Sequence, residues 1–322
     1  MKAPSFWNIK EGRDAAFVLR TLLVPLSWVY DYFTQKKLLK TKYVQLDIPV
    51  ISIGNLTLGG TGKTPMADLL ANSLPGAFIV SRGYGGSVID AIVVNPQIHT
   101  AKDVGDEPLM LAAKHQVVIG KDRVAAANLA VQNGAKAIIL DDAHQNPALK
   151  KDVSIILIDG GVGFGNGFIC PAGPLREKPE VGLKRADIVV WVGDKALFEE
   201  TLGGFDIKTL FAKIVPVKKQ FSGKYLAFCG IGRPDKFGDS LKDVGIDVVD
   251  LIPFADHHFF TDDEISHLKT RAKEMGAKLI TTEKDLIRLS AQQKSDIETL
   301  EIKLEFENDG DVSEILNLLP KM

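Results

Sequence analysis

A glycine-rich segment that contains one lysine and one threonine side by side is the part of the chain with the clearest chemical meaning. The apolar run Val50–Ile53 leads into the sequence GNLTLGGTGKTP at residues 54–65, and a helix is expected from Met66 to Leu74. This order of strand, loop and helix is the one that a phosphate-binding P-loop requires. Glycines let backbone N–H groups turn toward phosphate oxygens, and the start of the helix adds a favourable dipole. The sequence therefore predicts a site for the phosphates of a nucleotide.

Individual roles follow from the side chains of this loop. Lys63 is expected to reach the β- and γ-phosphates of ATP, and the Thr64 hydroxyl to ligate Mg²⁺. The other residues expected to bind the nucleotide are Thr57, Gly59, Gly60, Thr61 and Gly62. Thr57 stands where the G-x-x-x-x-G-K-[ST] pattern usually has its first glycine. A glycine-rich turn without a ligand is the alternative, and the lysine, the threonine and the flanking elements together argue against it.

Carboxylates that could hold the metal follow two other apolar runs. Asp141 and Asp142 come directly after Ala137–Leu140, and Asp159 follows Ile155–Ile158. A single aspartate at the end of a strand is often a helix cap or a turn residue. Two adjacent carboxylates raise each other's pKa unless a cation lies near them. We therefore favour Asp141 and Asp142 for Mg²⁺ and keep Asp159 as the second candidate.

Asp106 and Glu107 could supply the carboxylate that a kinase needs at its acceptor. Such an enzyme deprotonates the acceptor hydroxyl or holds it in line. Asp106 is equally typical of a helix N-cap before Glu107 and Pro108, so both interpretations stay open. The segment Asp-His-His at residues 256–258 could likewise be a base-orienting group or a solvated loop. It has no third ligand at a spacing that suits zinc.

Short β-branched runs alternate with helix-length segments along most of the chain, which predicts an α/β fold with a parallel sheet flanked by helices. The expected strands of the first unit are Pro49–Ile53, Ala77–Val80, Ala91–Val94, Val117–Ile119, Ala137–Leu140, Ile155–Ile158 and Ile188–Val192. Those of a second unit are Leu226–Gly230, Asp247–Leu251, Lys278–Thr282 and Ile302–Phe306. We predict a P-loop nucleotide-binding and catalytic domain at 43–215. A smaller C-terminal α/β domain at 216–322 is expected to close the cleft between them.

Composition excludes several classes of protein. The chain has 322 residues, of which 45% are hydrophobic and 25% charged, so global disorder is excluded. The net charge of −2 argues against a generally basic nucleic-acid-binding protein. Two cysteines, Cys170 and Cys229, provide no disulfide framework and fit a reducing, cytosolic compartment.

The charge is nevertheless distributed unevenly, because residues 1–42 hold eight basic and three acidic side chains, a net +5 against −7 for the rest. Within this segment, residues 17–33 are strongly apolar. Their uncharged run at 21–30 is too short for a hydrocarbon core, which needs about 20 residues. One interpretation is a helix that lies on an anionic membrane surface, with lysines following it at 36, 37, 40 and 42. The other is a helix buried against the body of the protein. Pro25 is expected to kink or divide it.

Further motifs occur in order over nearly the whole chain. They are SRGYG at 81–85, GDEP at 105–108, GKDR at 120–123, LDD at 140–142, GNG at 165–167, PAGPLRE at 171–177, RAD at 185–187, GIG at 230–232, FADH at 254–257 and TEKD at 282–285. Together with the P-loop they resemble the tetraacyldisaccharide 4′-kinase family, the lipid A 4′-kinases of Gram-negative bacteria. The ordered set is specific, whereas the P-loop alone is generic.

The resemblance implies a lipid kinase that transfers the γ-phosphate of ATP, with Mg²⁺, to the 4′-hydroxyl of a tetraacyldisaccharide 1-phosphate. In that reaction Asp106 accepts the hydroxyl proton and His257 orients it, while Glu107 joins the metal ligands. The residues expected to contact the lipid A precursor are Arg82, Asn166 and Arg176. The resemblance also favours the membrane-surface interpretation of the N-terminal segment, on the cytoplasmic face of the inner membrane. We expect a monomer that binds no nucleic acid.

Two positions depart from the family pattern of Asp-Asp-Gly, an apolar residue and Gln-His. This chain has Ala143 and His144 after the aspartate pair. Ala143 puts in doubt any role that requires a positive φ or a close backbone approach at that position. Two other classes of function remain as alternatives. One is a P-loop ATPase or metallochaperone-type nucleotide switch at the membrane surface, and the other is a non-enzymatic nucleotide sensor there.

Overall fold

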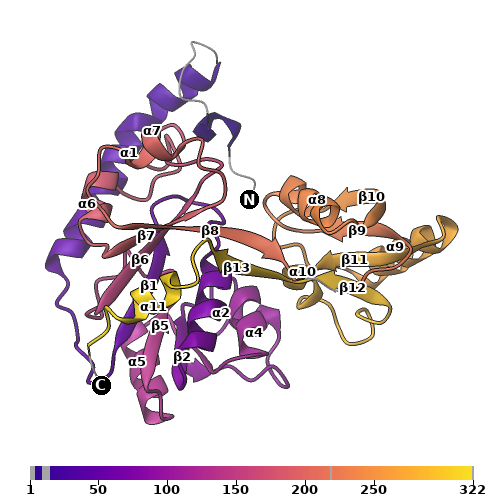
Figure 1. Ribbon diagram of the computed structural model, residues 1–322, viewed down its shortest axis with the longest axis horizontal. Helices are drawn as coiled ribbons and strands as arrows, with labels where there is room; N and C mark the ends of the chain where they lie inside the picture. Colours follow the sequence, from indigo (N-terminus) through magenta and orange to yellow (C-terminus); the bar gives the residue numbers. More distant parts are fainter. Residues whose placement is uncertain (1–3, 9–14, 218–219, 321–322) are drawn as a thin grey trace.

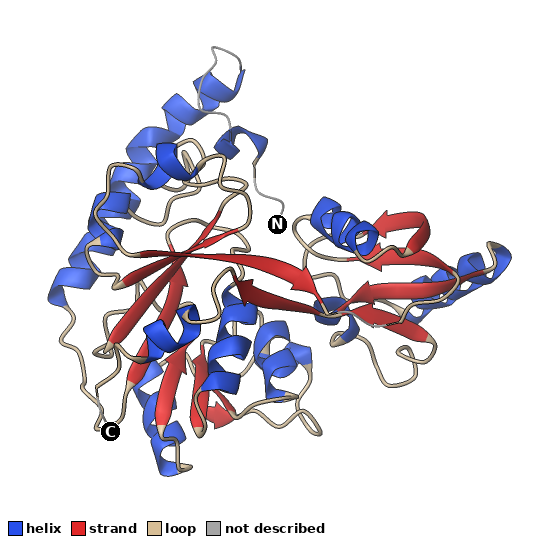
Figure 2. Cartoon of the chain, in the orientation of Figure 1, coloured by secondary structure: helices blue, strands red, loops and turns tan. Residues whose placement is uncertain are grey.

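The protein consists of two α/β units that are joined by a pair of antiparallel strands, as the computed structural model in Figure 1 shows. The structure describes residues 4–8, 15–217 and 220–320. The larger unit is built on a nine-stranded sheet and the smaller one on a four-stranded sheet. Figure 2 shows helices on both sides of the large sheet.

The helices are α1 (Ala15–Lys40), α2 (Lys63–Ser73), α3 (Ala101–Val104), α4 (Asp106–Ala112), α5 (Arg123–Gln132), α6 (Pro179–Leu183), α7 (Phe198–Leu202), α8 (Pro234–Asp243), α9 (Asp262–Glu274), α10 (Glu283–Leu286) and α11 (Asp311–Leu316), with a 3₁₀ turn η1 (Ser5–Asn8). The strands are β1 (Val50–Asn55), β2 (Ala77–Ser81), β3 (Ile92–Val93), β4 (Val117–Ile119), β5 (Ala137–Leu140), β6 (Val153–Asp159), β7 (Ile188–Val192), β8 (Thr209–Pro216), β9 (Lys224–Cys229), β10 (Asp247–Pro253), β11 (Ala277–Thr282), β12 (Ile297–Leu300) and β13 (Ile302–Phe306).

The strand that leads into the glycine-rich loop lies at the centre of the large sheet. The strand order is β13-β8-β7-β6-β1-β5-β2-β4-β3, and β1 pairs in parallel with both β5 and β6. All six residues of β1 are buried, as expected for a strand covered on both faces. Because parallel strands end at one edge of a sheet, the aspartates after β5 and at the end of β6 flank the loop after β1. The expected α/β architecture with a parallel sheet flanked by helices is confirmed.

Two faces of this sheet carry separate apolar cores. On one face Met66 and Leu70 of α2 pack with Ile51 and Ile53 of β1, and Leu304 of β13 belongs to the same core. The opposite face packs against the small side chains of α5 near β5, and against α6 and α7 near β7. The sheet is therefore held rigidly from both sides at the strand that precedes the loop.

One expected strand belongs to a different sheet from the one predicted. The run Ile302–Phe306 was expected in the second unit, and it instead pairs antiparallel with β8 in the nine-stranded sheet. The chain thus leaves the large sheet through β8 and returns through β13, and the N–H of Val217 donates to the carbonyl of Glu301 between them. Periodicity gives the presence of a strand but not its partner, so the sequence carried no signal for this return.

The smaller unit is a parallel sheet in the order β10-β9-β11-β12. Its two faces bury apolar side chains against α8 and α9 respectively. In Figure 1 it lies beside the large unit, with α10 next to α4. The residues that follow β10 and β11 therefore come near the start of α4.

The long N-terminal helix α1 lies against the large unit with its polar side inward. Ser27 is buried, where its hydroxyl donates to the carbonyl of Ile169 at 2.6 Å and accepts from the N–H of Ala172. The Arg20 guanidinium lies 5.1 Å from the ring centre of Phe168. The apolar side chains that remain exposed are Phe17, Val18, Leu19, Leu22, Leu26, Trp28, Val29, Tyr30, Tyr32, Phe33 and Leu39.

This arrangement decides between the two interpretations of residues 17–33 as far as packing is concerned. The apolar face is not buried against the body, so that alternative was wrong, and so was the expected division at Pro25, since α1 continues through it. Among the described residues, no helix is long and apolar enough to cross a membrane.

Gly54 in β1 lies against His144, which offers a test of the packing below the loop. A Cβ atom on Gly54 would lie 2.4 Å from the Cβ of His144 and 3.0 Å from its backbone nitrogen. Because both residues are buried in a strand-centred core, we expect Gly54→Ala to lower the free energy of unfolding by about 1–3 kcal/mol in urea denaturation. At Gly204 a Cβ would meet nothing within 4 Å, so the control Gly204→Ala should stay within about 0.5 kcal/mol. Equal effects of the two substitutions would contradict this packing.

Candidate active site

The loop between β1 and α2 is tied to a second segment of the large unit. The N–H of Leu58 donates to the carbonyl of Pro174, and the N–H of Arg176 donates to the carbonyl of Leu56, both at 2.7 Å. Gly62 has φ of 90°, a conformation that favours glycine, and it precedes the first turn of α2 with no side chain capping that turn. The N–H groups at the start of α2 therefore remain available to an anion.

Several buried polar atoms around this loop have no hydrogen-bond partner among the described residues. They include Asn55 Oδ1, Thr61 Oγ1 and Asp141 Oδ1. Buried polar atoms in proteins almost always have partners. Three orphaned atoms around one glycine-rich loop are therefore what a loop shaped for phosphate and its metal ion would contain. The residues present fit a nucleotide phosphate.

Lys63, Asp142 and Arg176 meet beside the loop. Lys63 Nζ lies 3.6 Å from Asp142 Oδ1, and one terminal nitrogen of Arg176 donates to both carboxylate oxygens of Asp142 at 2.9 and 3.1 Å. Burial acts to raise the pKa of Asp142, but the charges of Lys63 and Arg176 outweigh it, so the pKa lies below its ordinary value. Asp142 also has φ of 50°, which is uncommon for a residue with a side chain. The turn after β5 is thus held in a conformation that places this carboxylate against Lys63.

Asp141 differs from its neighbour in its electrostatic environment. Burial, together with the charges of Glu107 and Asp142, raises the pKa of Asp141 to about 7. Glu107 is paired with Lys284 of the smaller unit at 2.5 Å, and its pKa is lowered although burial acts to raise it. In the part of the chain that the structure describes, no three His, Cys, Asp or Glu side chains form a metal cage. Mg²⁺ at phosphate sites is commonly held by one or two carboxylates together with waters and phosphate oxygens, so Asp141 and Thr64 suit that role.

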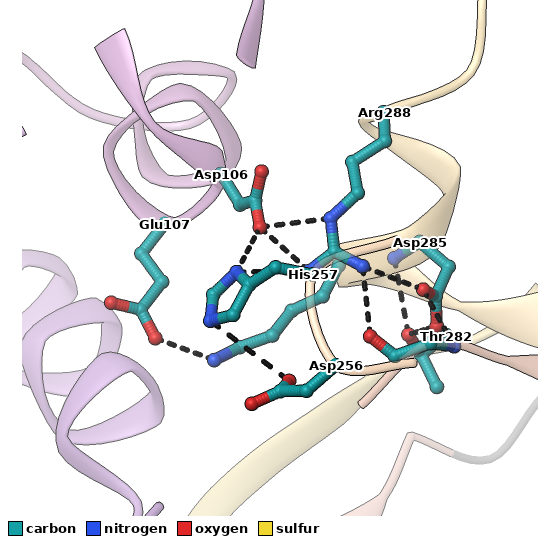
Figure 3. A network of polar contacts seen from close by, with 9 residues as sticks. Asp106, Glu107, Asp256, His257, Thr282, Asp285 and Arg288 are labelled. Atoms are coloured by element: carbon teal, nitrogen blue, oxygen red, sulfur yellow. Dashed lines mark hydrogen bonds and ion pairs between the residues drawn. The ribbon is translucent and has the colours of Figure 1, made fainter. Parts of the chain in front are cut away.

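A cluster of charged side chains joins the two units at Asp106 (Figure 3). Oδ2 of Asp106 accepts from Arg288 Nε at 2.8 Å and from an Arg288 terminal nitrogen at 2.6 Å, and it lies 2.8 Å from His257 Nδ1. Arg288 also donates to Asp285 at 2.8 Å and to the carbonyl of Gly230 at 2.9 Å. The same carbonyl accepts from the backbone N–H of His257, whose φ of 59° is uncommon.

The pKa directions in this cluster follow from these contacts. Burial acts to raise the pKa of Asp106, but hydrogen bonds from His257 and Arg288 outweigh it, so its pKa is lowered and the carboxylate is ionised. The hydrogen bond with Asp106 raises the pKa of His257. The three contacts of Asp106 all fall on Oδ2, which leaves Oδ1 as the oxygen for a hydroxyl group.

The alternative that Asp106 only caps its helix was wrong in detail. The cap position of α4 falls on Gly105, and Asp106 is the first residue of the helix, with its carboxylate turned toward the smaller unit. The backbone of Gly105 has φ of 91°, and a Cβ there would lie 2.4 Å from the carbonyl oxygen of Tyr84. This glycine therefore permits the turn that aims Asp106 away from its own helix.

Arg288 is the main site residue that the sequence reasoning missed. It is 8% exposed and contributes both the strongest contacts of Asp106 and the link to Asp285. Its only sequence signal is the spacing of three residues from Asp285 at the start of a short helix, a pattern that also occurs in ordinary surface pairs. Lys284, the partner of Glu107, was within a quoted motif but had no assigned role.

The remaining expected site residues lie in different surroundings. Asp159 ends β6 and is paired with Arg233 at 2.6 Å and Lys236 at 2.8 Å, both from the start of α8. Asn166 is buried, and its side-chain amide donates to the carbonyls of Phe6 and Ala172, near the N-terminal 3₁₀ turn. Arg82 is exposed in the loop after β2. Neither Asp159 nor Asn166 is in contact with the Asp106 cluster in these hydrogen bonds.

A buried polar frame supports the loop from below, and it includes the unusual His144. Glu177 accepts from Arg185 at 2.7 and 2.8 Å and from Gln145 at 3.0 Å, and Gln145 also donates to the carbonyl of Asn55 at 2.8 Å. His144 contacts the hydroxyl of Ser154 and the carbonyl of Gly182 at 3.1 and 3.0 Å. The frame thus connects the end of β1, the turn that bears Asp142 and the segment that bears Arg176.

The sheet, the loop and the facing carboxylates define a P-loop protein whose phosphate site adjoins a buried acid–histidine–arginine cluster. The chain belongs to the tetraacyldisaccharide-1-P 4′-kinase family, whose model matches residues 19–319. It is 41% identical to the tetraacyldisaccharide 4′-kinase of Hyphomonas neptunium over 98% of this chain and 97% of that protein. It is 42% identical to the one of Jannaschia sp. over 96% of each.

A solved structure is similar as well. The crystal structure of the "apo" form of LpxK from Aquifex aeolicus in complex with ATP superposes with a TM-score of 0.75. The two chains are 28% identical, and the match covers 93% of this chain and 98% of that one.

The burial of His144 predicts a pH dependence of stability. Burial, with the charges of Lys151 and Arg185, lowers its pKa to about 3. The unfolded chain binds a proton near pH 6.5 and the folded chain only near pH 3, so stability falls as pH decreases through this window. Between pH 7 and 5 we expect the wild type to lose about 2 kcal/mol more than His144→Gln in the free energy of unfolding, since one pKa unit corresponds to 1.36 kcal/mol. Parallel declines of the two proteins would contradict the buried neutral histidine.

Proposed function

We propose that the protein transfers the γ-phosphoryl group of ATP to the 4′-hydroxyl of a tetraacyldisaccharide 1-phosphate, as the names of its relatives state for them. The observation that carries this proposal is the buried carboxylate of Asp106, ionised and oriented by His257 and Arg288, next to Glu107 and the phosphate loop. A nucleotide switch or sensor has no need of a carboxylate held ready for a hydroxyl group. The ATP in the similar solved structure supports the choice of nucleotide.

Residues of the phosphate loop have the first set of roles in this proposal. The N–H groups of the loop and Lys63 bind the phosphates, with Thr57, Gly59, Gly60, Thr61 and Gly62 shaping the loop. Thr64 and Asp141 hold Mg²⁺, and Asp142 and Glu107 contribute directly or through water. When bound, ATP and Mg²⁺ supply an electrophilic phosphoryl group with part of its charge neutralised. Asp159, already paired with two cations, takes no part as a ligand here.

Asp106 has the central role at the acceptor. Its free oxygen Oδ1 accepts the hydroxyl proton, while His257 and Arg288 hold the carboxylate through Oδ2. A carboxylate with a lowered pKa is a weak base, but a loose transition state demands little of the base, so positioning contributes more than basicity. The acceptor oxygen is thereby placed in line with the phosphate bound by Lys63.

Candidates for contacts with the rest of the acceptor are the two arginines and the asparagine that the family resemblance implies. Arg176 keeps its Nε buried without a partner among the described residues, and Arg82 is exposed, so both guanidinium groups can take up an oxyanion. Asn166 already donates to two backbone carbonyls, which suits a role in shaping the loop at 164–176 rather than direct contact. All of these residues lie in one chain, in keeping with a monomeric enzyme.

We further propose that the protein works as a peripheral protein on an anionic membrane surface, at the cytoplasmic face of the inner membrane. The support is the outward apolar face of α1, with Leu22 and Trp28 each 70% exposed, and the lysines at its C-terminal end. An apolar helix face with lysines beside it is typical of helices that lie in the membrane interface. The acyl chains of the substrate would keep it at that surface.

The central experiment is incubation of the protein with Mg-ATP and the lipid disaccharide, followed by mass analysis for one added phosphate. Asp106→Ala should lower kcat by about 10²- to 10⁴-fold because it removes the proton acceptor, while the Kd for ATP stays near that of the wild type. Turnover close to the wild-type value would overturn the role of Asp106. ATP hydrolysis that proceeds equally without the disaccharide would favour the ATPase alternative.

Membrane binding is tested on the exposed face of α1. Leu22→Ser together with Trp28→Ser should lower partitioning onto vesicles that contain anionic phospholipid by at least about tenfold, since each removes apolar area from the interface. The matched control Ile98→Ser removes a side chain that is 71% exposed elsewhere and should leave partitioning unchanged. Binding of ATP in solution should be the same for all three proteins. Unchanged partitioning of the α1 variant would contradict the proposal.

A further inference from the structure

An exposed aromatic ring stands beside the Asp106 cluster and has no role in the fold. The side chain of Tyr84, in the loop after β2, is 74% exposed. Its ring contacts the ring of His257 edge-on, with 6.3 Å between the centroids and 62° between the planes. His257 in turn lies 2.8 Å from Asp106. The ring is therefore the neighbour of the group that holds the proton acceptor, and its faces are open to solvent.

The backbone that carries Tyr84 is fixed rather than loose. Gly83 and Gly85 on either side have φ of 70° and 82°, and the N–H of Gly86 donates to the carbonyl of Gly83. The next two N–H groups of the loop, those of residues 87 and 88, donate to the carbonyls of residues 102 and 103 in α3. The loop thus follows α3, which leads directly into α4.

The contact with Gly105 fixes Tyr84 relative to Asp106 in particular. A Cβ on Gly105 would lie 2.4 Å from the carbonyl oxygen of Tyr84, so these two backbones touch at the residue that precedes Asp106. A side chain two bonds from a fixed Cα has few rotamers to lose when a ligand binds. The ring is consequently presented at a defined place beside the acceptor site.

A planar ring with an exposed face binds groups that offer C–H bonds, because its π-face carries partial negative charge and its surface is apolar. The ring faces of a sugar offer such C–H bonds, and hydroxyl groups lie around their rim. The nucleotide is a less suitable partner, since its phosphates belong at Lys63 and the loop, whereas Tyr84 adjoins the histidine that orients the acceptor base. A large exposed aromatic side chain on a fixed loop is also typical of binding sites rather than of ordinary surfaces.

We propose that Tyr84 determines acceptor specificity, its ring packing against the face of the glucosamine unit that bears the reacting hydroxyl. This inference rests on the proposed function, because it names the part of the acceptor that the site binds. The packing holds the sugar by its face and so directs the hydroxyl at its edge toward Oδ1 of Asp106. Both the identity and the orientation of the acceptor then depend on the ring rather than on the phenol hydroxyl.

The experiment compares Tyr84→Phe, which keeps the ring, with Tyr84→Leu, which keeps an apolar side chain but removes the ring. Tyr43→Leu is the matched control, because Tyr43 is 62% exposed and lies before β1, at the opposite edge of the large sheet. Two quantities are measured for each protein in detergent micelles. They are the Kd for the tetraacyldisaccharide 1-phosphate without nucleotide, by calorimetry, and the steady-state KM for that acceptor and for ATP.

We expect Tyr84→Leu to raise the Kd and the KM for the acceptor about tenfold and to leave the KM for ATP unchanged. Tyr84→Phe and Tyr43→Leu should stay within about twofold of the wild type. Acceptor binding that Tyr84→Leu leaves unchanged, or a rise in the KM for ATP instead, would overturn the inference. If the wild type binds the disaccharide and Tyr84→Leu weakens that binding, but no phosphate is transferred, the proposed function fails while the inference is supported.

Discussion

The structure depends on one buried ion pair, between the Asp106 carboxylate and the Arg288 guanidinium. Both side chains are almost fully buried, and removal of one partner from such a pair typically destabilises a protein by about 3–5 kcal/mol. Arg288 also binds Asp285 and the carbonyl of Gly230, and that carbonyl holds the backbone of His257. The contact between the two units and the orientation of the acceptor base are therefore the same set of hydrogen bonds.

Charge is divided between the units in a way that explains how they face each other. The larger unit supplies the carboxylates of Asp106, Glu107 and Asp159 to this interface. The smaller unit supplies the cations that pair with them, namely Arg288, Lys284, Arg233 and Lys236. The pair Lys114–Glu283 has the opposite polarity and is longer, at 3.4 Å. Because hydrogen bonds to charged groups are directional, these pairs fix where the smaller unit sits beside the phosphate loop. Within the larger unit, Lys63 and Arg176 balance Asp142.

Local features of this protein could be predicted from its sequence, and long-range partnerships could not. The strand, the loop and α2 follow from residues 50–74 alone, because periodicity and glycine placement are local properties. The aspartates after β5 and β6 were expected beside the loop, since parallel strands end at one edge. The pairing of β13 with β8, the inward polar side of α1 and the role of Arg288 depend on segments far apart in the chain. Arg288 is separated from Asp106 by 182 residues. The positive φ angles of Asp142 and His257 likewise arise from their surroundings and not from their residue types.

The central claim is that Asp106 and Arg288 act as one unit in the phosphoryl transfer, and a double-mutant cycle on kcat/KM for the acceptor tests it most directly. The proteins compared are the wild type, Asp106→Asn, Arg288→Met and the double variant. Residues that act as a unit have non-additive effects, so the double variant should lose little more activity than the worse single variant, with a coupling free energy of at least about 1 kcal/mol. Losses that add within about 0.3 kcal/mol would show that Arg288 does not act through Asp106 and would contradict the account.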